Sequence, residues 1–231
     1  MPANDRNIRD APTAHDESPS SHDAAPTRDP ATEEQILAAH IGGQVPLNGP
    51  IIIADYDPAW PRLFERERDR IRAALGDRVV MIEHVGSTSV PGLAAKPRID
   101  LLLVVADSAD EPSYVPALEA AGYVLRIREP DWYQHRVFKG PDTDVNLHVF
   151  SAGSGRPEIG RMLLFRDWLR TNEADRRLYE RTKRDLASRT WKYTQNYADA
   201  KTTVVEGILA RAQAHADDQG RGSGGENSTD L

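Results

Sequence analysis

Residues 84–103 read HVGSTSVPGLAAKPRIDLLL, a turn of small polar residues between two apolar segments, followed by one lysine and one aspartate. Gly86 allows the backbone to approach a ligand closely, and the hydroxyl and amide groups that follow it suit phosphate oxygens, namely those of Ser87, Thr88 and Ser89. Lys96 supplies a mobile positive charge. Asp100 enters an apolar strand where an unpaired carboxylate is costly to bury, so we expect a cation or water beside it. The stretch predicts a phosphate and metal site.

Apolar periodicity on either side of this stretch predicts the fold. The expected strands are short apolar or alternating runs bounded by turn residues, and they cover residues 79–82, 99–105, 123–128, 134–139 and 144–150. The expected helices carry apolar residues at helical spacing, and they cover residues 32–40, 58–75, 110–121, 157–170, 173–188 and a last segment ending near 212. The predicted fold class is α+β, a mixed sheet flanked by helices with a helical C-terminal half.

The two ends of the chain differ in composition from the middle. Residues 1–34 contain almost no large apolar side chain, and residues 220–225 read GRGSGG, so neither end buries enough surface to offset chain entropy. We expect a disordered or loosely ordered tail at 1–47, one domain at 48–212 and a disordered tail at 213–231. The ends carry most of the formal charge of −7, which leaves the domain nearly neutral.

Composition also excludes several classes of function. The chain has no cysteine, which rules out disulfides, zinc–thiolate sites and a cysteine nucleophile. No apolar run approaches the roughly 20 residues that span a bilayer, and the N-terminus lacks the pattern of a secretory signal. A cytoplasmic location with no membrane partner is expected. Nucleic acid is disfavoured as a partner because the domain is nearly neutral and has no long basic stripe.

A second polar cluster is expected on the last strand. Asp144, Asn146 and His148 occupy alternate positions, so their side chains project from one face of that strand. If this strand neighbours the one that carries Asp100, then Asp144 offers a second carboxylate, and His148 could orient it or transfer a proton. The alternative is an edge strand whose polar face meets solvent.

Basic residues supply the remaining candidates for binding phosphate. The chain has 24 arginines and only five lysines, so lysine is the exception here. Lys183 and Lys201 each lie four residues after a tyrosine, which places a base beside a phenol on one helix face. Arg166 on a helix and Arg136 on a strand are further candidates. The alternative for the helical bases is a packed stem with an exposed head.

Ordered motifs across about 160 residues resemble the GrpB family. The matching segments are 54–60 ADYDPAW, 83–93 EHVGSTSVPGL, 96–101 KPRIDL, 146–150 NLHVF and 165–170 FRDWLR, followed by Tyr179, Lys183, Tyr197 and Lys201. More distantly, a Gly-Ser turn followed by an aspartate on the next strand resembles the nucleotidyltransferase superfamily. The resemblance implies a nucleotidyltransferase-like fold that is also found appended to some bacterial dephospho-CoA kinases. It does not specify an activity.

One position departs from the nucleotidyltransferase pattern. Leu102 stands two residues after Asp100, where an active member carries a second metal-binding acid, which argues against two-metal chemistry. A single Mg²⁺ held by Asp100 and Asp144 together with substrate phosphates remains physically compatible.

Two functions are therefore expected. The first is a protein that binds a nucleotide or another phosphorylated small molecule and could transfer a nucleotidyl group, with Asp100, Asp144 and His148 as catalytic residues. The second is a non-catalytic module that binds and assists a partner enzyme such as a dephospho-CoA kinase.

Overall fold

A five-stranded mixed sheet forms the centre of the protein, for which the computed structural model describes residues 29–43, 46–47 and 50–222. The strands lie in the order β1, β2, β5, β4, β3, where only β2 and β5 run parallel. Their bounds are β1 Met81–Val85, β2 Ile99–Val105, β3 Val124–Glu129, β4 His135–Lys139 and β5 Val145–Ser151. The α+β prediction and the mixed sheet are confirmed.

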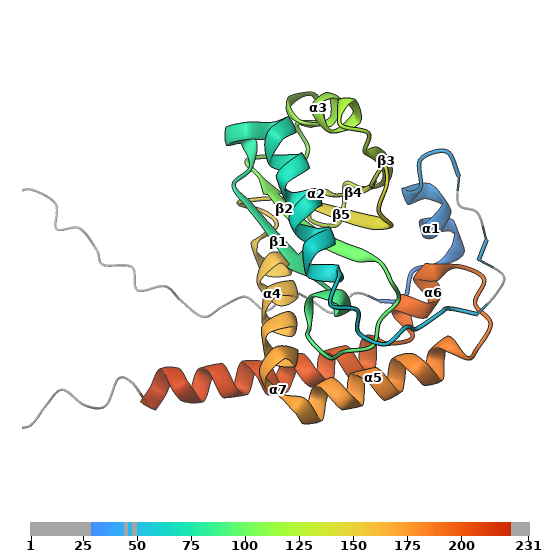
Figure 1. The fold of residues 1–231 in the computed structure, drawn as a ribbon, viewed down its shortest axis with the longest axis vertical. Coiled ribbons are helices and arrows are strands. Elements are labelled where there is room, and N and C mark those ends of the chain that lie inside the picture. The colour runs from blue at the N-terminus through green and yellow to red at the C-terminus, as the bar shows by residue number, and fades with distance from the viewer. Residues whose placement is uncertain (1–28, 44–45, 48–49, 223–231) are drawn as a thin grey trace, which may run out of the picture.

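Helices cover both faces of this sheet and extend below it (Figure 1). Their bounds are α1 Glu33–Ala39, α2 Trp60–Leu75, α3 Val115–Ala120, α4 Arg156–Thr171, α5 Glu173–Ala187, α6 Thr194–Asp199 and α7 Thr202–Gly222. In Figure 1, α5 and α7 lie beneath the sheet, whereas α1 and α6 stand beside it. None of the helices in the described part of the chain is long and apolar enough to cross a membrane.

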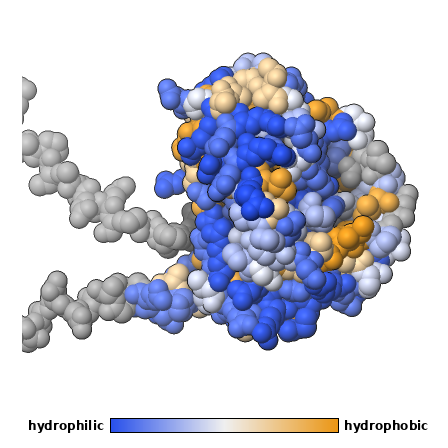
Figure 2. All heavy atoms as spheres, in the orientation of Figure 1, coloured by the Kyte–Doolittle hydropathy of each residue, from blue (hydrophilic) through white to orange (hydrophobic). Residues whose placement is uncertain are grey.

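One face of the sheet carries the main hydrophobic core. Residues at odd positions of β2 and β5 are fully or almost fully buried and pack against α2 and α3, because alternate side chains of a strand share a face. Glu67 of α2 is also buried on this side, and its carboxylate accepts hydrogen bonds from Tyr123 Oη at 2.6 Å and Thr143 Oγ1 at 2.7 Å. The outer side of α2 belongs to the largely hydrophilic surface that Figure 2 shows.

The opposite face of the sheet is divided into an apolar and a polar half. Leu102, Val104 and Phe150 pack against Ile159 of α4 and form the apolar half. The polar half lies at the beginning of β2 and β5, where Asp100 is paired in register with Asn146. Because β5 lies between β2 and β4, its polar face is not that of an edge strand.

The structure differs from the predicted elements mainly at the C-terminus. We predicted a last helix that ends near residue 212, but the chain forms two helices, and α7 continues to Gly222. Low apolar content beyond 212 misled the prediction, because extending an existing helix needs no new nucleus and alanine-rich sequence favours it. The predicted helix at 110–121 is a 3₁₀ turn at Glu111–Ser113 followed by α3. The tail predictions for 1–28 and 223–231 lie outside the described residues.

Candidate functional site

The polar turn after β1 meets the aspartate of β2. Gly86 has a backbone φ of 69°, and a Cβ atom added there would collide with the Asp100 carboxylate. A side chain at this position would be excluded both by the backbone conformation and by the lack of space. The turn continues as a 3₁₀ helix, Ser87–Ser89. The turn and the acid predicted to share a site therefore lie in direct contact.

Both groups line a cavity of about 730 Å³ between the polar half of the sheet and the surrounding helices. Its floor consists of side chains from β2, β5, β4 and β3, which include Asp100, Asn146, His148, His135, Lys139 and Glu129. Its walls come from the turn, from α5 and from α6 and α7. The short helix α1 contributes Gln35, Ile36 and Ala39. The volume is in the range of sites that bind small molecules.

Four of the five lysines in the chain line this cavity, namely Lys96, Lys139, Lys183 and Lys201. They come from the loop before β2, from β4, from α5 and from the turn before α7, so the fold collects them from distant parts of the sequence. The fifth, Lys192, is half-exposed and pairs with Glu33 on the surface. Lys183 and Lys201 were predicted site residues, and the structure places both in the lining of the same cavity as Lys96.

Burial lowers the proton affinity of several of these amines. Desolvation brings the pKa of Lys183 to about 7, and repulsion from Lys201 acts in the same direction. Desolvation also brings the pKa of Lys139 to about 8 and lowers that of Lys96, with Arg98 adding repulsion in both cases. An anion in the cavity would relieve this repulsion and favour the charged amines.

A chain of polar contacts crosses the cavity floor and connects Asp100 to groups on β4 and β5. Lys139 Nζ donates to Asn146 Oδ1 at 2.5 Å, and Asn146 Nδ2 donates to Asp100 Oδ1 at 2.9 Å. His148 Nε2 lies 3.9 Å from the same carboxylate oxygen. Burial acts to raise the pKa of Asp100, but His148 and Asn146 outweigh it, and the pKa lies below its usual value. Asp100 is therefore held as a carboxylate.

The contacts of His148 extend further along the floor to an unexpected partner. Its Nδ1 lies 3.0 Å from His135 Nε2, and the two rings stack with centroids 5.2 Å apart. The other ring nitrogen of His135 lies 2.7 Å from Glu129 Oε2. We assigned no role to His135 from the sequence, although it shares a strand face with Lys139. The alternation of side chains along β4 was the sequence signal that could have predicted the position of His135 beside the site.

The hydroxyl groups of the turn do not all face the cavity. Ser89 is buried outside the cavity lining and donates to Gly86 O at 2.6 Å, and Thr88 donates to Arg98 O at 3.1 Å. Ser87 lines the cavity, and within the described residues its hydroxyl forms no hydrogen bond. Of the three predicted hydroxyls, only that of Ser87 is therefore unengaged in the part of the chain that the structure describes.

His84 stabilises the turn from the side of the core. Its Nε2 lies 3.1 Å from Thr88 Oγ1, and its ring stacks on Phe64 with centroids 4.8 Å apart. Burial lowers its pKa to about 4, despite the nearby Asp100 carboxylate. His84 is therefore a core histidine whose Nε2 contact and stacking are satisfied within the fold.

The two acids expected to share a metal ion are bound differently. β5 does neighbour β2, as the hypothesis required, but the Asp144 carboxylate is half-exposed and pairs with Arg98 Nε at 2.7 Å. No three His, Asp or Glu side chains of residues 29–43, 46–47 and 50–222 come together as a metal site. The donor set does not form a ready site for Mg²⁺, so this cofactor stays a prediction that depends on ligand phosphates. Leu102 is fully buried in the apolar half.

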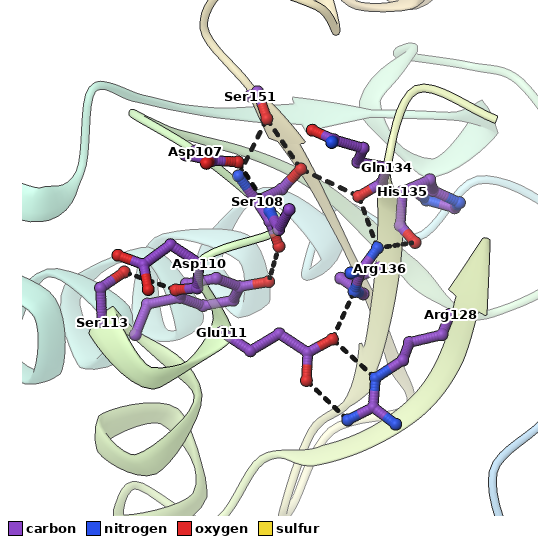
Figure 3. Close-up of polar contacts among 12 residues, drawn as sticks. Asp107, Ser108, Asp110, Glu111, Ser113, Arg128, Gln134, His135, Arg136 and Ser151 are labelled. Atoms are coloured by element: carbon purple, nitrogen blue, oxygen red, sulfur yellow. Dashed lines mark hydrogen bonds and ion pairs between the residues drawn. The ribbon is translucent and has the colours of Figure 1, made fainter. Parts of the chain in front are cut away.

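Two of the predicted phosphate-binding arginines lie outside the cavity. Arg166 Nη1 of α4 donates to Glu83 Oε2 at 2.8 Å and to the backbone of His84, which ties α4 to β1. Arg136 is buried on the other face of β4, where its Nε donates to Glu111 Oε1 at 2.6 Å. Figure 3 shows Arg136 and Arg128 converging on that one carboxylate. Arg166 and Arg136 are therefore both occupied by structural ion pairs.

The fold and this site together define a class of protein, a mixed-sheet α+β domain with a lysine-rich cavity on one face of its sheet. A sequence model described as "GrpB protein" matches residues 50–211. The chain belongs to the GrpB family.

Individual relatives agree with this membership. The UPF0157 protein BH1888 of Halalkalibacterium halodurans is 60% identical over 185 residues, which cover 80% of this chain and 94% of that protein. The crystal structure of the conserved protein GrpB from Enterococcus faecalis matches with a TM-score of 0.62 and 31% identity, and the match covers 71% of this chain and 99% of that one. A dephospho-CoA kinase of Mycolicibacterium paratuberculosis is 28% identical over 197 residues, 74% of this chain but 48% of the kinase.

Proposed function

We propose that this protein binds a phosphorylated small molecule, such as a nucleotide, in the cavity on the polar half of the sheet. The observation that carries the proposal is the convergence of four of the five lysines on this one space. Ammonium groups bind phosphate as point charges, and their mutual repulsion falls when an anion enters. Lys96 and Lys201 have no carboxylate in ion-pair contact within the described residues, so both charges are available to a ligand.

The turn would add directional hydrogen bonds to this charge. Ser87 lines the same cavity as Lys96, and the absence of a side chain at Gly86 lets the Asp100 carboxylate pack directly against this turn. The rings of His148, His135 and Phe150 stack in one column on the cavity floor, and of the three only His148 is more than marginally exposed. The His148 ring could contact the ring system of a ligand, which favours nucleotides among the phosphorylated ligands.

The finer proposal is nucleotidyl transfer. In that reaction a hydroxyl group attacks the α-phosphate of a nucleoside triphosphate, a base accepts the hydroxyl proton, and the α–β phosphoanhydride bond breaks so that pyrophosphate leaves. Asp100 is held as a carboxylate 3.9 Å from His148, so either group could accept this proton while Lys96 and Lys201 neutralise charge on the phosphate. When bound, Mg²⁺ would contribute further charge neutralisation at the phosphates.

Thermal denaturation with ligands tests the proposal. We expect ATP with Mg²⁺, or another phosphorylated metabolite, to raise the melting temperature of the full chain. Asp100→Asn and Ser87→Ala should each remove that rise, because one removes the carboxylate that would bind Mg²⁺ and the other the hydroxyl at the cavity wall. Ser113→Ala, at an exposed hydroxyl on the far side of the sheet, is the matched control. The absence of a shift with every phosphorylated compound would defeat the proposal.

A second candidate function is a non-catalytic module that binds a partner enzyme. The similarity to part of a dephospho-CoA kinase favours it, because that protein joins a related segment to a further one. Pull-down experiments with wild-type and Asp100→Ala protein separate the two candidates. A partner that binds both proteins equally supports the module, whereas a phosphate-dependent melting shift that Asp100→Ala removes supports the ligand site.

A further inference from the structure

Lys183 is unusual among the cavity lysines in its burial and in its partners. Its side chain is 2% exposed, yet it lines the cavity from α5. Its ammonium donates to the backbone carbonyl of Ala94 and lies 4.8 Å from the centroid of the Tyr179 ring. Neither partner carries a negative charge, so among residues 29–43, 46–47 and 50–222 the buried amine has no carboxylate in ion-pair contact, which buried lysines normally require.

The neighbouring charges also disfavour a permanent cation at this position. Lys201 and Arg184 repel the ammonium, and the acid that attracts it, Glu180, is itself bound by Arg184 at 3.0 Å. These surroundings and the burial bring the pKa to about 7, so roughly half of the amine is neutral at neutral pH, against about one part in three thousand for an ordinary lysine. The chain uses arginine for 24 of its 29 basic residues, but arginine cannot lose its proton.

We propose that Lys183 is a nucleophile that forms a reversible imine with the carbonyl group of an aldehyde or ketone ligand in the cavity. Burial without a carboxylate partner and a place in the wall of a lysine-rich cavity are the features that support it. The inference rests on the proposed function in one respect: the preferred ligand carries both a carbonyl and a phosphate, with the phosphate at Lys96 and Lys201.

The chemical step balances without any further reactant. The lone pair of the neutral amine attacks the carbonyl carbon, and a carbon–nitrogen bond forms. The carbonyl oxygen then leaves as water with the two protons of the amine, and a carbon–nitrogen double bond remains. Nothing is oxidised or reduced. Lys201 favours the step because a second cation keeps the attacking amine neutral, and Tyr179 covers it from solvent.

Trapping with a phosphorylated aldehyde tests the inference. The full chain is mixed with pyridoxal 5′-phosphate near pH 7.5, the imine is reduced with borohydride, and the labelled lysines are mapped by mass spectrometry. Five lysines make the map simple. We expect labelling at Lys183 to exceed that at exposed Lys192 by about tenfold or more, because the neutral fractions differ by far more than that. Lys183→Arg should remove this label, and Lys192→Arg should leave it unchanged.

The outcomes separate this inference from the proposed function. Preferential labelling of Lys183 that pyrophosphate suppresses supports both. Preferential labelling that pyrophosphate does not suppress, and that pyridoxal without phosphate gives equally well, supports the imine and counts against phosphate binding. If pyrophosphate binds by calorimetry but Lys192 is labelled as fast as Lys183, the inference is overturned and the phosphate site stands. The map of the wild-type protein decides this even where Lys183→Arg does not fold.

Discussion

Gly86 and Asp100 lie so close together that no side chain could be added to Gly86 without displacing the Asp100 carboxylate. Gly86 directly follows strand β1, and Asp100 is the second residue of the paired strand β2, where Val85 and Asp100 are opposite in register. This contact brings the polar turn, the acid and the lysine-rich cavity into one site. The same contact gives the first test of the account.

Replacement of Gly86 by alanine should destabilise the protein and displace Asp100. The backbone φ of 69° disfavours a side chain, and the added carbon would collide with the carboxylate. We expect the free energy of unfolding in urea to fall by about 2–4 kcal/mol, from backbone strain and overpacking together. Gly92→Ala is the matched control, because Gly92 has a similar φ of 76° but open space around it. Equal losses in the two variants would contradict the contact.

The stability of the protein should decrease as the pH falls through the window set by His84. Its pKa is about 4 in the folded protein and ordinarily 6.5, so the unfolded chain takes up a proton first. The stability that the neutral ring contributes is complete above about pH 6.5 and is lost progressively toward pH 4, with an upper limit of about 3 kcal/mol. Urea titrations at pH 7 and 5 measure the loss. His84→Gln should show a smaller difference between the two pH values, and an unchanged difference would refute this assignment.

A second pH window has the same sign and depends on Lys183. Its pKa of about 7 in the folded protein is below the ordinary 10.5, so between these values the unfolded chain binds more protons. Stability should therefore rise with pH from about 7 to 10, by no more than about 1.4 kcal/mol per pH unit from this residue. Lys183→Met should reduce the rise, part of which comes from Lys139 and Lys96, whose pKa values burial also lowers, whereas exposed Lys192→Met should keep it in full. An undiminished slope in Lys183→Met would show that the amine is not buried as described.

Local sequence predicted most of the fold because its elements are clearly bounded. The strand at 99–105 was predicted with its observed bounds, since a branched apolar run between a proline-containing loop and a polar turn has few alternatives. The helix that ends at Leu75, directly before Gly76, was also clear. The end of α7 was not clear from the sequence. Residues beyond 212 bury little apolar surface, but they continue a helix that has already formed and so need no new nucleus.

The site was only partly predictable for a different reason. Alternation on one strand showed that Asp144, Asn146 and His148 share a face, but only the sheet order shows that this face meets Asp100. Ion pairs between residues distant in the sequence then decide which predicted bases reach the cavity. Arg166 is bound to Glu83, a contact that the sequence does not reveal. We did not predict Lys139 as a site residue, because it lies outside the sequence motifs that contain the other three cavity lysines. The rarity of lysine in this chain was nevertheless a signal for this position.

Calorimetric titration with pyrophosphate tests the central claim most directly, because pyrophosphate carries the charge of a nucleotide without its base. We expect the wild-type protein to bind it with a measurable heat. Lys96→Met and Lys201→Met should each weaken binding by about tenfold, in line with the loss of one charge-assisted contact. Lys192→Met, which changes a surface lysine outside the cavity, should bind like the wild type. Absence of binding by the wild-type protein, or equal weakening in all three variants, would contradict the claim that this cavity is an anion site.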